Sequence, residues 1–323
     1  MTEDMQKRHG LRRQYVSRYV PRNPKLITVV LLVISVVNSA VSSSQYVVII
    51  EEFRPVLISQ FYMIQTTGYD SSMMNGLNML PQYKDYFHLD TATTGLNTAA
   101  LWIGNVVGCL VVQPVPDTLG RKKAILVSAV ICFIGIIVQS AAQNTGMFVA
   151  GRIVVGFGAQ LSGGACPVLI GELIPPARRG AILGLFFSFF YVGSLMAAGI
   201  NYRTVEIGTT WAWRVPSILQ CVPSILALVF LPFVPESPRW LIFKGHLEHA
   251  REVLTVMSGK DDVNDAGVEA VFDETLAVLT MEEEQHPRNP WVEIVSTRAN
   301  RKRLAIIVVF GVMIEMLGNF VIS

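Results

Sequence analysis

Long runs of apolar residues alternate with short polar segments along most of the chain. The runs lie near residues 26–50, 95–116, 124–142, 147–171, 181–200, 213–234 and 304–323. A helix needs about 20 predominantly apolar residues to cross the hydrocarbon core of a bilayer. The pattern therefore predicts a membrane protein with several transmembrane α-helices, whereas the segment 51–80 is too mixed in polarity to assign.

Basic residues in the short loops predict which helix ends face the cytosol. Arg121, Lys122 and Lys123 follow directly on one apolar run, and Arg178 and Arg179 lie in a loop two spans later. Short loops that are rich in Lys and Arg resist translocation across the membrane. We therefore expect both loops to be cytosolic, and the same parity places the segment after the sixth span in the cytosol.

That segment, 235–303, is predicted to be a linker of short helices. It carries charges of both signs, and His246–Met257 and Val268–Glu284 place apolar residues on one helical face. The N-terminal residues are rich in Lys and Arg without an early apolar core, which excludes a cleavable signal peptide. We predict a cytosolic tail over 1–25, a transmembrane bundle over 26–234, cytosolic linker helices over 235–303 and an incomplete seventh helix over 304–323.

The composition agrees with a membrane protein and excludes several functional classes. Hydrophobic residues make up 51% of the chain and charged residues 15%, with a mean hydropathy of +0.45. A net charge of +2 gives no basic surface for nucleic acid, and no catalytic or phosphate-binding motif is present. The cysteines lie in apolar runs without metal-ligand spacing. We therefore expect no enzyme activity, cofactor, metal site or disulfide.

Glycines at close spacing in two of the runs predict tightly packed helices. Gly104 and Gly108 lie about one turn apart in one run, and Gly151, Gly156 and Gly158 follow in another. Small residues let helix backbones approach closely where lipid supplies no hydrophobic driving force. The spacing predicts a packed bundle and does not identify a substrate.

The loop Pro116–Lys123 is similar to the loop between the second and third helices of the major facilitator superfamily. Its Asp, Gly and basic positions match that pattern, whereas Gln113 and Thr118 depart from it. Further motifs follow in the order of the sugar porter family of this superfamily: Gly151-Arg152, Pro167–Gly180, Trp213–Ser217 and Pro235–Leu241. The chain therefore resembles a sugar porter.

The run Gly68–Gly76 sharpens this resemblance, because it is similar to the first-helix motif of fungal hexose and lactose permeases. Members of the family have an all-α major facilitator fold with twelve helices in two halves and a substrate site between them. The chain reaches Ser323, inside what would be the seventh helix. We therefore expect the N-terminal six-helix half, the cytosolic linker helices and the start of the seventh helix, as in a truncated product.

Residues 41–65 interrupt the expected first helix. Family members run from an apolar stretch like Leu26–Ala40 directly into the Gly-Tyr-Asp motif, and joining Ala40 to Thr66 restores one helix. We interpret 41–65 as an aberrant insert, such as an unspliced in-frame intron. The alternative is a real extra or re-entrant segment, although an extra span would place a basic segment outside.

Asp70 and Arg152 are the candidates for proton coupling. A carboxylate at membrane depth costs roughly 2.5–3.5 kcal/mol on insertion scales, so Asp70 needs a partner or a function. Arg152 is expected at a similar depth on a helix that runs in the opposite direction. In proton-coupled sugar porters the matching residues form a pair, which the resemblance implies here. The alternative is an interfacial Asp with an Arg that reaches toward the outer interface.

Charged residues at the cytosolic ends match family positions that hold the inner face closed. The resemblance implies that they form a gating network with the linker helices, because isolated surface pairs contribute only about 0–1 kcal/mol. A simple positive-inside role is the alternative. The set is Asp117, Gly120, Arg121, Glu172, Arg179, Glu236 and Arg239.

Substrate-binding residues are only weakly indicated. The sugar-binding Gln of the family's fifth helix falls at Phe187, and paired polar positions of the seventh helix fall at Ile314 and Glu315. Asn319 remains as a ligand for a hydroxyl group, and Phe187 and Tyr191 are candidates for packing against a sugar ring. These departures leave another polyol-like solute open.

The sequence thus predicts a secondary active transporter of sugars in the plasma membrane, with sugar and proton as its partners and the bilayer as its environment. Proton symport is favoured over facilitated diffusion because Asp70 and Arg152 are both present. An uncoupled carrier is one alternative. A sugar sensor of the same fold, or a defective half-length product without transport activity, is the other.

Overall fold

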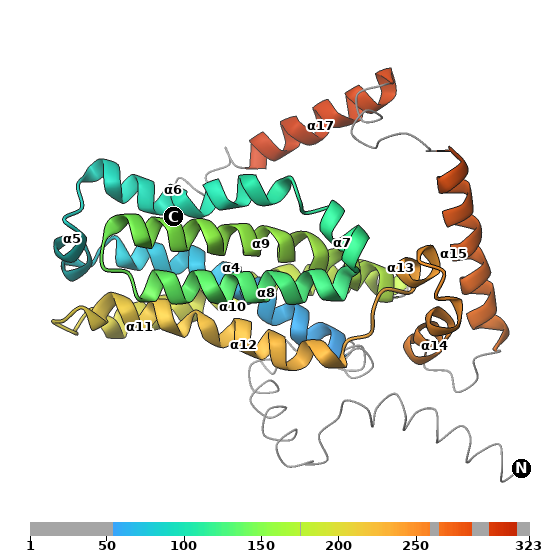
Figure 1. Cartoon of the computed structure of the whole chain (residues 1–323), viewed down its shortest axis with the longest axis horizontal. Helices are drawn as coiled ribbons and strands as arrows, with labels where there is room; N and C mark the ends of the chain where they lie inside the picture. The colour runs from blue at the N-terminus through green and yellow to red at the C-terminus, as the bar shows by residue number, and fades with distance from the viewer. Residues whose placement is uncertain (1–53, 175, 259–264, 286–296, 315–323) are drawn as a thin grey trace, which may run out of the picture. The chain divides into compact units, whose positions relative to one another are not determined.

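A computed structural model describes residues 54–174, 176–258, 265–285 and 297–314 of the chain, and every regular element within them is a helix (Figure 1). The all-α fold predicted from the apolar runs is confirmed. The chain divides into two compact units, Met1–Val268 and Glu269–Ser323. The first unit contains the long helices, and the second contains most of α15 and all of α17.

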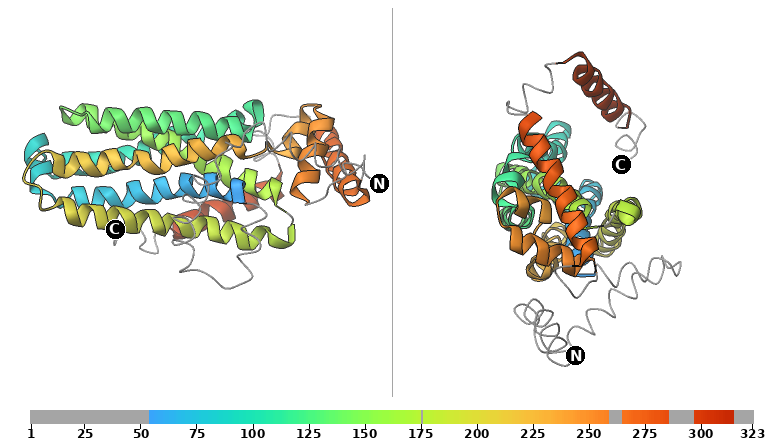
Figure 2. Two further views of the ribbon diagram at one scale, coloured as in Figure 1. Left: turned by 90° about the horizontal axis from the view of Figure 1, so that it is seen from below. Right: turned by 90° about the vertical axis from the view of Figure 1, so that its right-hand side faces the viewer.

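The long helices of the first unit run side by side as a bundle (Figures 1 and 2). They are α4 (Arg54–Leu77), α6 (Thr91–Cys109), α8 (Arg121–Ser140), α9 (Thr145–Leu173) and α10 (Pro176–Thr204). The shorter helices α11 (Trp211–Leu219) and α12 (Cys221–Phe230) follow one another and together make up one further span. Among the described residues, four segments are long and apolar enough to cross a membrane: Arg121–Ser140, Thr145–Leu173, Arg178–Thr204 and Trp211–Phe233. Helices α4 and α6 have the length of a span but carry more polar residues.

The last of these spans is interrupted, although the sequence predicts one run over 213–234. Helix α11 ends at Leu219 and α12 begins at Cys221, with the 3-10 turn η2 (Leu231–Phe233) after it. Pro223 has no N–H group to donate to the carbonyl of Leu219, four residues earlier. The two helices therefore meet at Gln220, which lies inside the bundle.

Short helices lie at the two ends of the bundle. Following the orientation predicted from the basic loops, we call the end with α5 (Pro81–Phe87) the outer end. The end with α7 (Pro114–Leu119) is called the cytosolic end. Two further short helices, α13 (Pro238–Phe243) and α14 (Leu247–Met257), follow η2.

Glycines set the closest helix contacts, as the sequence predicts. A Cβ atom at Gly104 would collide with the carbonyl oxygen of Ile153, and one at Gly156 would collide with that of Leu101. These positions bring α6 and α9 into backbone contact. Gly68 does the same for α4 against α10, so a larger side chain at any of these positions would separate two helices.

The amphipathic stretches predicted in the linker are helical. Helix α14 covers one of them and α15 (Ala266–Gln285) covers the other. In the second unit, α17 (Arg298–Ile314) begins with a basic turn and continues into exposed apolar residues. Residues 315–323 of the predicted seventh span lie outside the described residues.

The predicted insert 41–65 is only partly within the described residues. Residues 54–65 belong to α4, the same helix as the Gly-Tyr-Asp motif, and residues 41–53 lie outside the described part of the chain. The boundaries of the tail, bundle and linker, and the interpretation of 41–65 as an insert, stay predictions.

Candidate functional site

A buried ion pair joins two helices in the outer half of the bundle. Asp70 lies on α4 and Arg152 on α9, and their side chains are 3% and 2% exposed. Arg152 Nη1 donates to Asp70 Oδ1 at 3.1 Å and Nη2 donates to Oδ2 at 3.4 Å. This two-pronged geometry fixes both the distance between the helices and the orientation of the two side chains.

Gln220 adds a third group to this pair. Its Nε2 donates to Asp70 Oδ1 at 2.8 Å, and the side chain is fully buried where α11 and α12 meet. The carboxylate of Asp70 thus accepts hydrogen bonds from two other helical segments. Gln220 was not among the residues predicted from the sequence, although a Gln between Pro216 and Pro223 in an apolar run could have indicated it.

Neighbouring hydrogen bonds hold α4 against α11 and α12. The Tyr69 hydroxyl donates to the Pro216 carbonyl at 2.9 Å, and the hydroxyls of Thr66 and Ser224 lie 3.4 Å apart. Movement at the ion pair would therefore be felt by α4, α9, α11 and α12.

Aromatic side chains close the outer end of the bundle beyond the ion pair. The Tyr83 ring of α5 lies 5.5 Å from Phe148 and 6.3 Å from Trp213, and Phe87 packs against the same two rings. Burial raises the pKa of Tyr83, while the charge of Arg152 lowers it. The Tyr83 hydroxyl therefore stays protonated at neutral pH. The aromatic rings form part of a buried hydrophobic cluster.

A second set of charges lies at the cytosolic end. Arg121 Nε donates to Glu172 Oε2 at 3.1 Å and Nη2 donates to Oε1 at 3.3 Å. Arg121 Nη2 also lies 3.2 Å from Asp117 Oδ1, and Nη1 donates to the Pro116 carbonyl. Arg121 thus connects the start of α8 to α7 and to the end of α9.

Glu236 joins the same end of the bundle from the segment before α13. Its Oε1 accepts from the backbone N–H of Lys122 and from that of Ser237, both at 3.0 Å. Gly120 has φ +98 and a Cβ there would press on the Glu236 carboxylate, so only glycine fits well. Trp240 Nε1 donates to the Asp117 carbonyl at 3.0 Å.

Two further members of the predicted gating set lie near these contacts. Arg239 is half-buried on α13, and Arg179 is exposed near the start of α10. The structure thus joins Asp117, Gly120, Arg121, Glu172 and Glu236 through contacts.

Comparison with known proteins identifies the family of the chain. The family described as "Sugar (and other) transporter" matches residues 56–323. The chain belongs to this family. It is a multi-pass membrane protein of the major facilitator superfamily and not an enzyme, as the sequence predicts.

Relatives of this sugar transporter family member include named transporters. The chain is 32% identical over 257 residues to the MFS-type transporter criB of Aspergillus cristatus, covering 79% of this chain and 55% of criB. It is 34% identical over 208 residues to the high-affinity glucose transporter of Kluyveromyces lactis, covering 64% of this chain and 38% of that protein. The chain spans about half the length of the curated relatives that it matches, or less.

A solved structure has the same fold. The proton:xylose symporter XylE, bound to 6-bromo-6-deoxy-D-glucose, superposes with a TM-score of 0.65 at 23% identity. The match covers 72% of this chain and 54% of the XylE chain. The N-terminal major facilitator fold expected from the sequence is confirmed.

Two of the residues predicted to contact a sugar lie on α10. Phe187 and Tyr191 of this family member are exposed on α10, and they pack edge to face against Phe186 and Phe190. Asn319 lies outside the described residues. Their roles in binding stay predictions.

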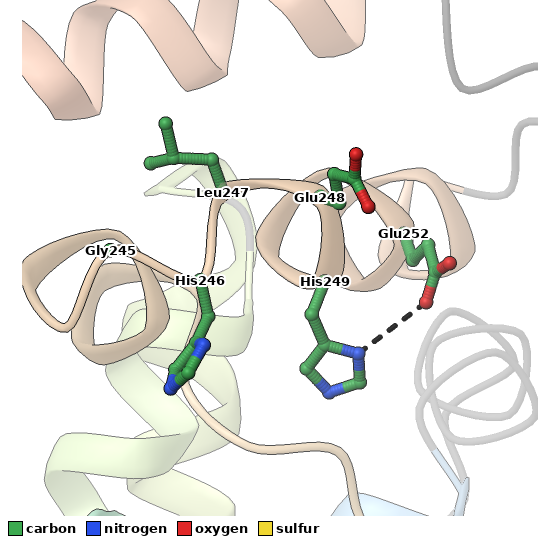
Figure 3. Close-up of a pocket in the computed structure, with 6 residues that line it drawn as sticks. All are labelled: Gly245, His246, Leu247, Glu248, His249 and Glu252. Carbon is green, nitrogen blue, oxygen red and sulfur yellow. Dashed lines mark hydrogen bonds and ion pairs between the residues drawn. The ribbon is translucent and has the colours of Figure 1, made fainter.

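A pocket of about 520 Å³ lies around the start of α14 and is lined by Gly245, His246, Leu247, Glu248, His249 and Glu252 (Figure 3). His249 Nδ1 lies 3.4 Å from Glu252 Oε2. The pocket is open and belongs to the segment after the bundle, so we do not assign it to transport. Among the described residues, no group of His, Cys, Asp and Glu could hold a metal ion.

Proposed function

We propose that the whole protein is a secondary active transporter that couples the movement of a sugar to that of protons. The observation that carries the proposal is the buried cluster of Asp70, Arg152 and Gln220. A carboxylate in such a place is expensive to keep charged without its partner, so its protonation and its contacts depend on each other.

Protonation of Asp70 would convert the carboxylate into a neutral acid. One of the Asp70 oxygens then becomes a donor. The negative charge that holds both terminal nitrogens of Arg152 is lost. The helices α4 and α9 are free to take up a second arrangement. A proton can shift a conformational equilibrium only by its different affinity for the two states, and this cluster provides such a difference.

The family and the relatives support a sugar as the solute. One relative is a glucose transporter, and the charged side chains described inside the bundle form a neutral pair. A neutral, hydroxyl-rich solute therefore meets no unbalanced charge. The departure at Phe187 leaves the identity of the sugar to experiment, and we propose the plasma membrane as the location of the protein.

The contacts at the cytosolic end would provide the gate. Arg121, Glu172 and Glu236 tie α8, α9 and the segment before α13 together, which favours the state in which this end is closed. Opening the gate requires these contacts to separate. The individual contacts are weak enough to break during each transport cycle.

The test is Asp70→Asn in the whole protein, reconstituted into proteoliposomes. The Asn side chain keeps the shape and can still accept from Gln220, but it cannot titrate. Uphill accumulation of glucose, xylose, galactose or lactose driven by a proton gradient should be lost, whereas counterflow of the same sugar should remain. The control is Ser128→Ala, which removes a buried hydroxyl bonded within its own helix.

The outcomes separate the alternatives. Accumulation at the wild-type level by Asp70→Asn would contradict a coupling role for this residue and favour an uncoupled carrier. If the wild-type protein gives neither accumulation nor counterflow with any of these sugars, transport itself is contradicted, and a sensor becomes the better interpretation.

A further inference from the structure

A layer of buried polar groups lies inside the bundle. Within the described part of the chain, several of its atoms have no hydrogen-bond partner, although the residues that carry them are no more than 1% exposed as a whole. These atoms are Asn97 Oδ1, Gln139 Nε2, Gln139 Oε1, Arg152 Nε, Trp213 Nε1 and Gln220 Oε1. Neither the ion pair nor the predicted gating contacts account for them.

The backbone contacts place two of these residues at the level of Arg152. Gly156 meets Leu101 of α6, so Asn97, one turn before Leu101, lies beside the turn of α9 that contains Arg152. Gly151 lies against the backbone of Gln139 on α8. Asn97 Nδ2 also donates at 2.9 Å to the hydroxyl of Tyr83, on which the charge of Arg152 acts.

Donors and acceptors in this layer are balanced. Arg152 Nε, Gln139 Nε2 and Trp213 Nε1 are donors, and Asn97, Gln139 and Gln220 each present one acceptor oxygen. A buried polar group without a partner is costly, and buried water typically makes two to four hydrogen bonds to such groups. Bound water can accept from the donors and donate to the acceptors at the same time.

We propose that Gln139 and Asn97 position Arg152 through hydrogen bonds carried by bound water. The guanidinium would then be held on two edges, with Asp70 at its terminal nitrogens and the water at Nε. Arg152 would keep its place when Asp70 is protonated, so the cluster would return to the same geometry after the proton leaves. This role in coupling rests on the proposed function, whereas the water-mediated contact does not.

The first test is the sign of a stability change. Replacing Gln139 by Leu removes both unpartnered atoms at similar volume. If the amide is bridged to Arg152, the melting temperature of the full chain in detergent should fall by roughly 2–4 °C. If the amide has no partner, Leu should leave the melting temperature unchanged or raise it, because an unsatisfied polar group is removed. That result would overturn the proposal.

A double-mutant cycle identifies the partner. Arg152→Lys keeps a positive charge toward Asp70 but has no Nε–H group, so Gln139→Leu should have little further effect in that background. An equal fall in both backgrounds would overturn the contact with Arg152. The control is Ser128→Ala on the same helix α8, whose hydroxyl donates to the Ile125 carbonyl at 2.7 Å and should act independently of Arg152.

The second readout is the pH profile of sugar uptake. In Gln139→Leu, the proton concentration at which uptake is half-maximal should change by at least threefold, because Asp70 then faces a less firmly held partner. Gln139→Asn should restore part of this shift. If the pH profile of uptake is unchanged while the double-mutant cycle still links Gln139 to Arg152, the proposed role of Gln139 in proton coupling is overturned. Because the stability cycle does not depend on transport, failure of the proposed function would leave its result readable.

Discussion

Two pairs of Arg and acidic side chains in this protein have similar distances and different surroundings. Arg152 lies 3.1 Å from Asp70 with both side chains at most 3% exposed, whereas Arg121 lies 3.1 Å from Glu172 with side chains 13% and 14% exposed. The deep pair, Arg152 and Asp70, contains one carboxylate, which also accepts from the neutral amide of Gln220. The pair at the cytosolic end adds Asp117, which is half exposed, and is open to solvent screening.

The difference shows that distance alone does not rank the two contacts. A buried ion pair gains little over an apolar replacement, but losing one partner leaves a charge without compensation. The deep pair is therefore suited to a group that changes its charge in a cycle. The contacts at the cytosolic end are suited to many small adjustments, because each is weak and easily broken.

The largest expected effect comes from removing an arginine at each place. Arg152→Ala should lower the free energy of unfolding by about 3–5 kcal/mol, because the Asp70 carboxylate then remains buried without a cationic partner. Arg121→Ala should lower it by about 1 kcal/mol or less. Denaturant unfolding in mixed micelles measures both values.

Equal losses for the two arginines would contradict the comparison. If Arg152→Ala does not yield folded protein, Arg152→Lys against Arg121→Lys tests the same ranking with the positive charge kept at both places.

The next effect concerns the neutral member of the deep cluster. Gln220→Leu removes one hydrogen bond to a charged group, and the free energy of unfolding should fall by about 1.5–3 kcal/mol. Ser217→Ala is the matched control, because this buried hydroxyl donates only to the Trp213 carbonyl within its own helix. A loss for Gln220→Leu no larger than for Ser217→Ala would show that Gln220 does not support Asp70.

Gln220 also shows where prediction from the sequence ended. The apolar runs located the helices from α6 to α12, whereas α4 lies in the segment 51–80 that the pattern left unassigned. The cost of burying the Asp70 carboxylate indicated a partner at similar depth. The contact with Gln220 depends on a helix break and on packing across 150 positions of the sequence, which periodicity does not reveal. The helix interruption at Gln220 and the hydrogen bond that it permits are properties of the folded bundle.

The cytosolic end was predicted as a set of charges but not as a geometry. Glu236 accepts from the backbone N–H of Lys122 at the start of α8 and from the backbone N–H of Ser237, which follows it in the chain. Such a contact depends on the φ of Gly120, which brings the carboxylate against the helix end. The sequence therefore indicated which residues gather at this end, and the fold decides which atoms meet.

A smaller effect separates the two regions by their response to salt. Glu172→Gln should lower the melting temperature at about 50 mM salt, and the difference from the wild type should shrink toward zero at about 1 M, where the Debye length is about 3 Å. The loss from Asp70→Asn should change little over the same range. Thermal unfolding monitored by tryptophan fluorescence at several salt concentrations tests this, and a parallel response of the two variants would contradict it.

The smallest expected effect extends the comparison to a carboxylate without an arginine. Asp90 caps the start of α6: its Oδ1 accepts from the backbone N–H of Thr93 at 2.8 Å and from the Thr93 hydroxyl at 2.6 Å. These hydrogen bonds, the one from the Thr93 side chain first, hold the pKa of Asp90 below its ordinary value of 3.8. A lowered pKa in the folded state means that the stabilisation is fully present above the ordinary value and is lost as the pH falls through the folded-state value.

We therefore expect Asp90→Asn to remove this acid dependence while keeping a cap, since Asn is also a good residue at this position. The melting temperatures of wild type and Asp90→Asn should converge below pH 3.8 and differ slightly at pH 7, with the wild type higher. Asp90→Ala should be lower than both at neutral pH, because it also removes the acceptor. If the wild-type advantage over Asp90→Asn grows as the pH falls, the carboxylate is not the charged acceptor at this helix start.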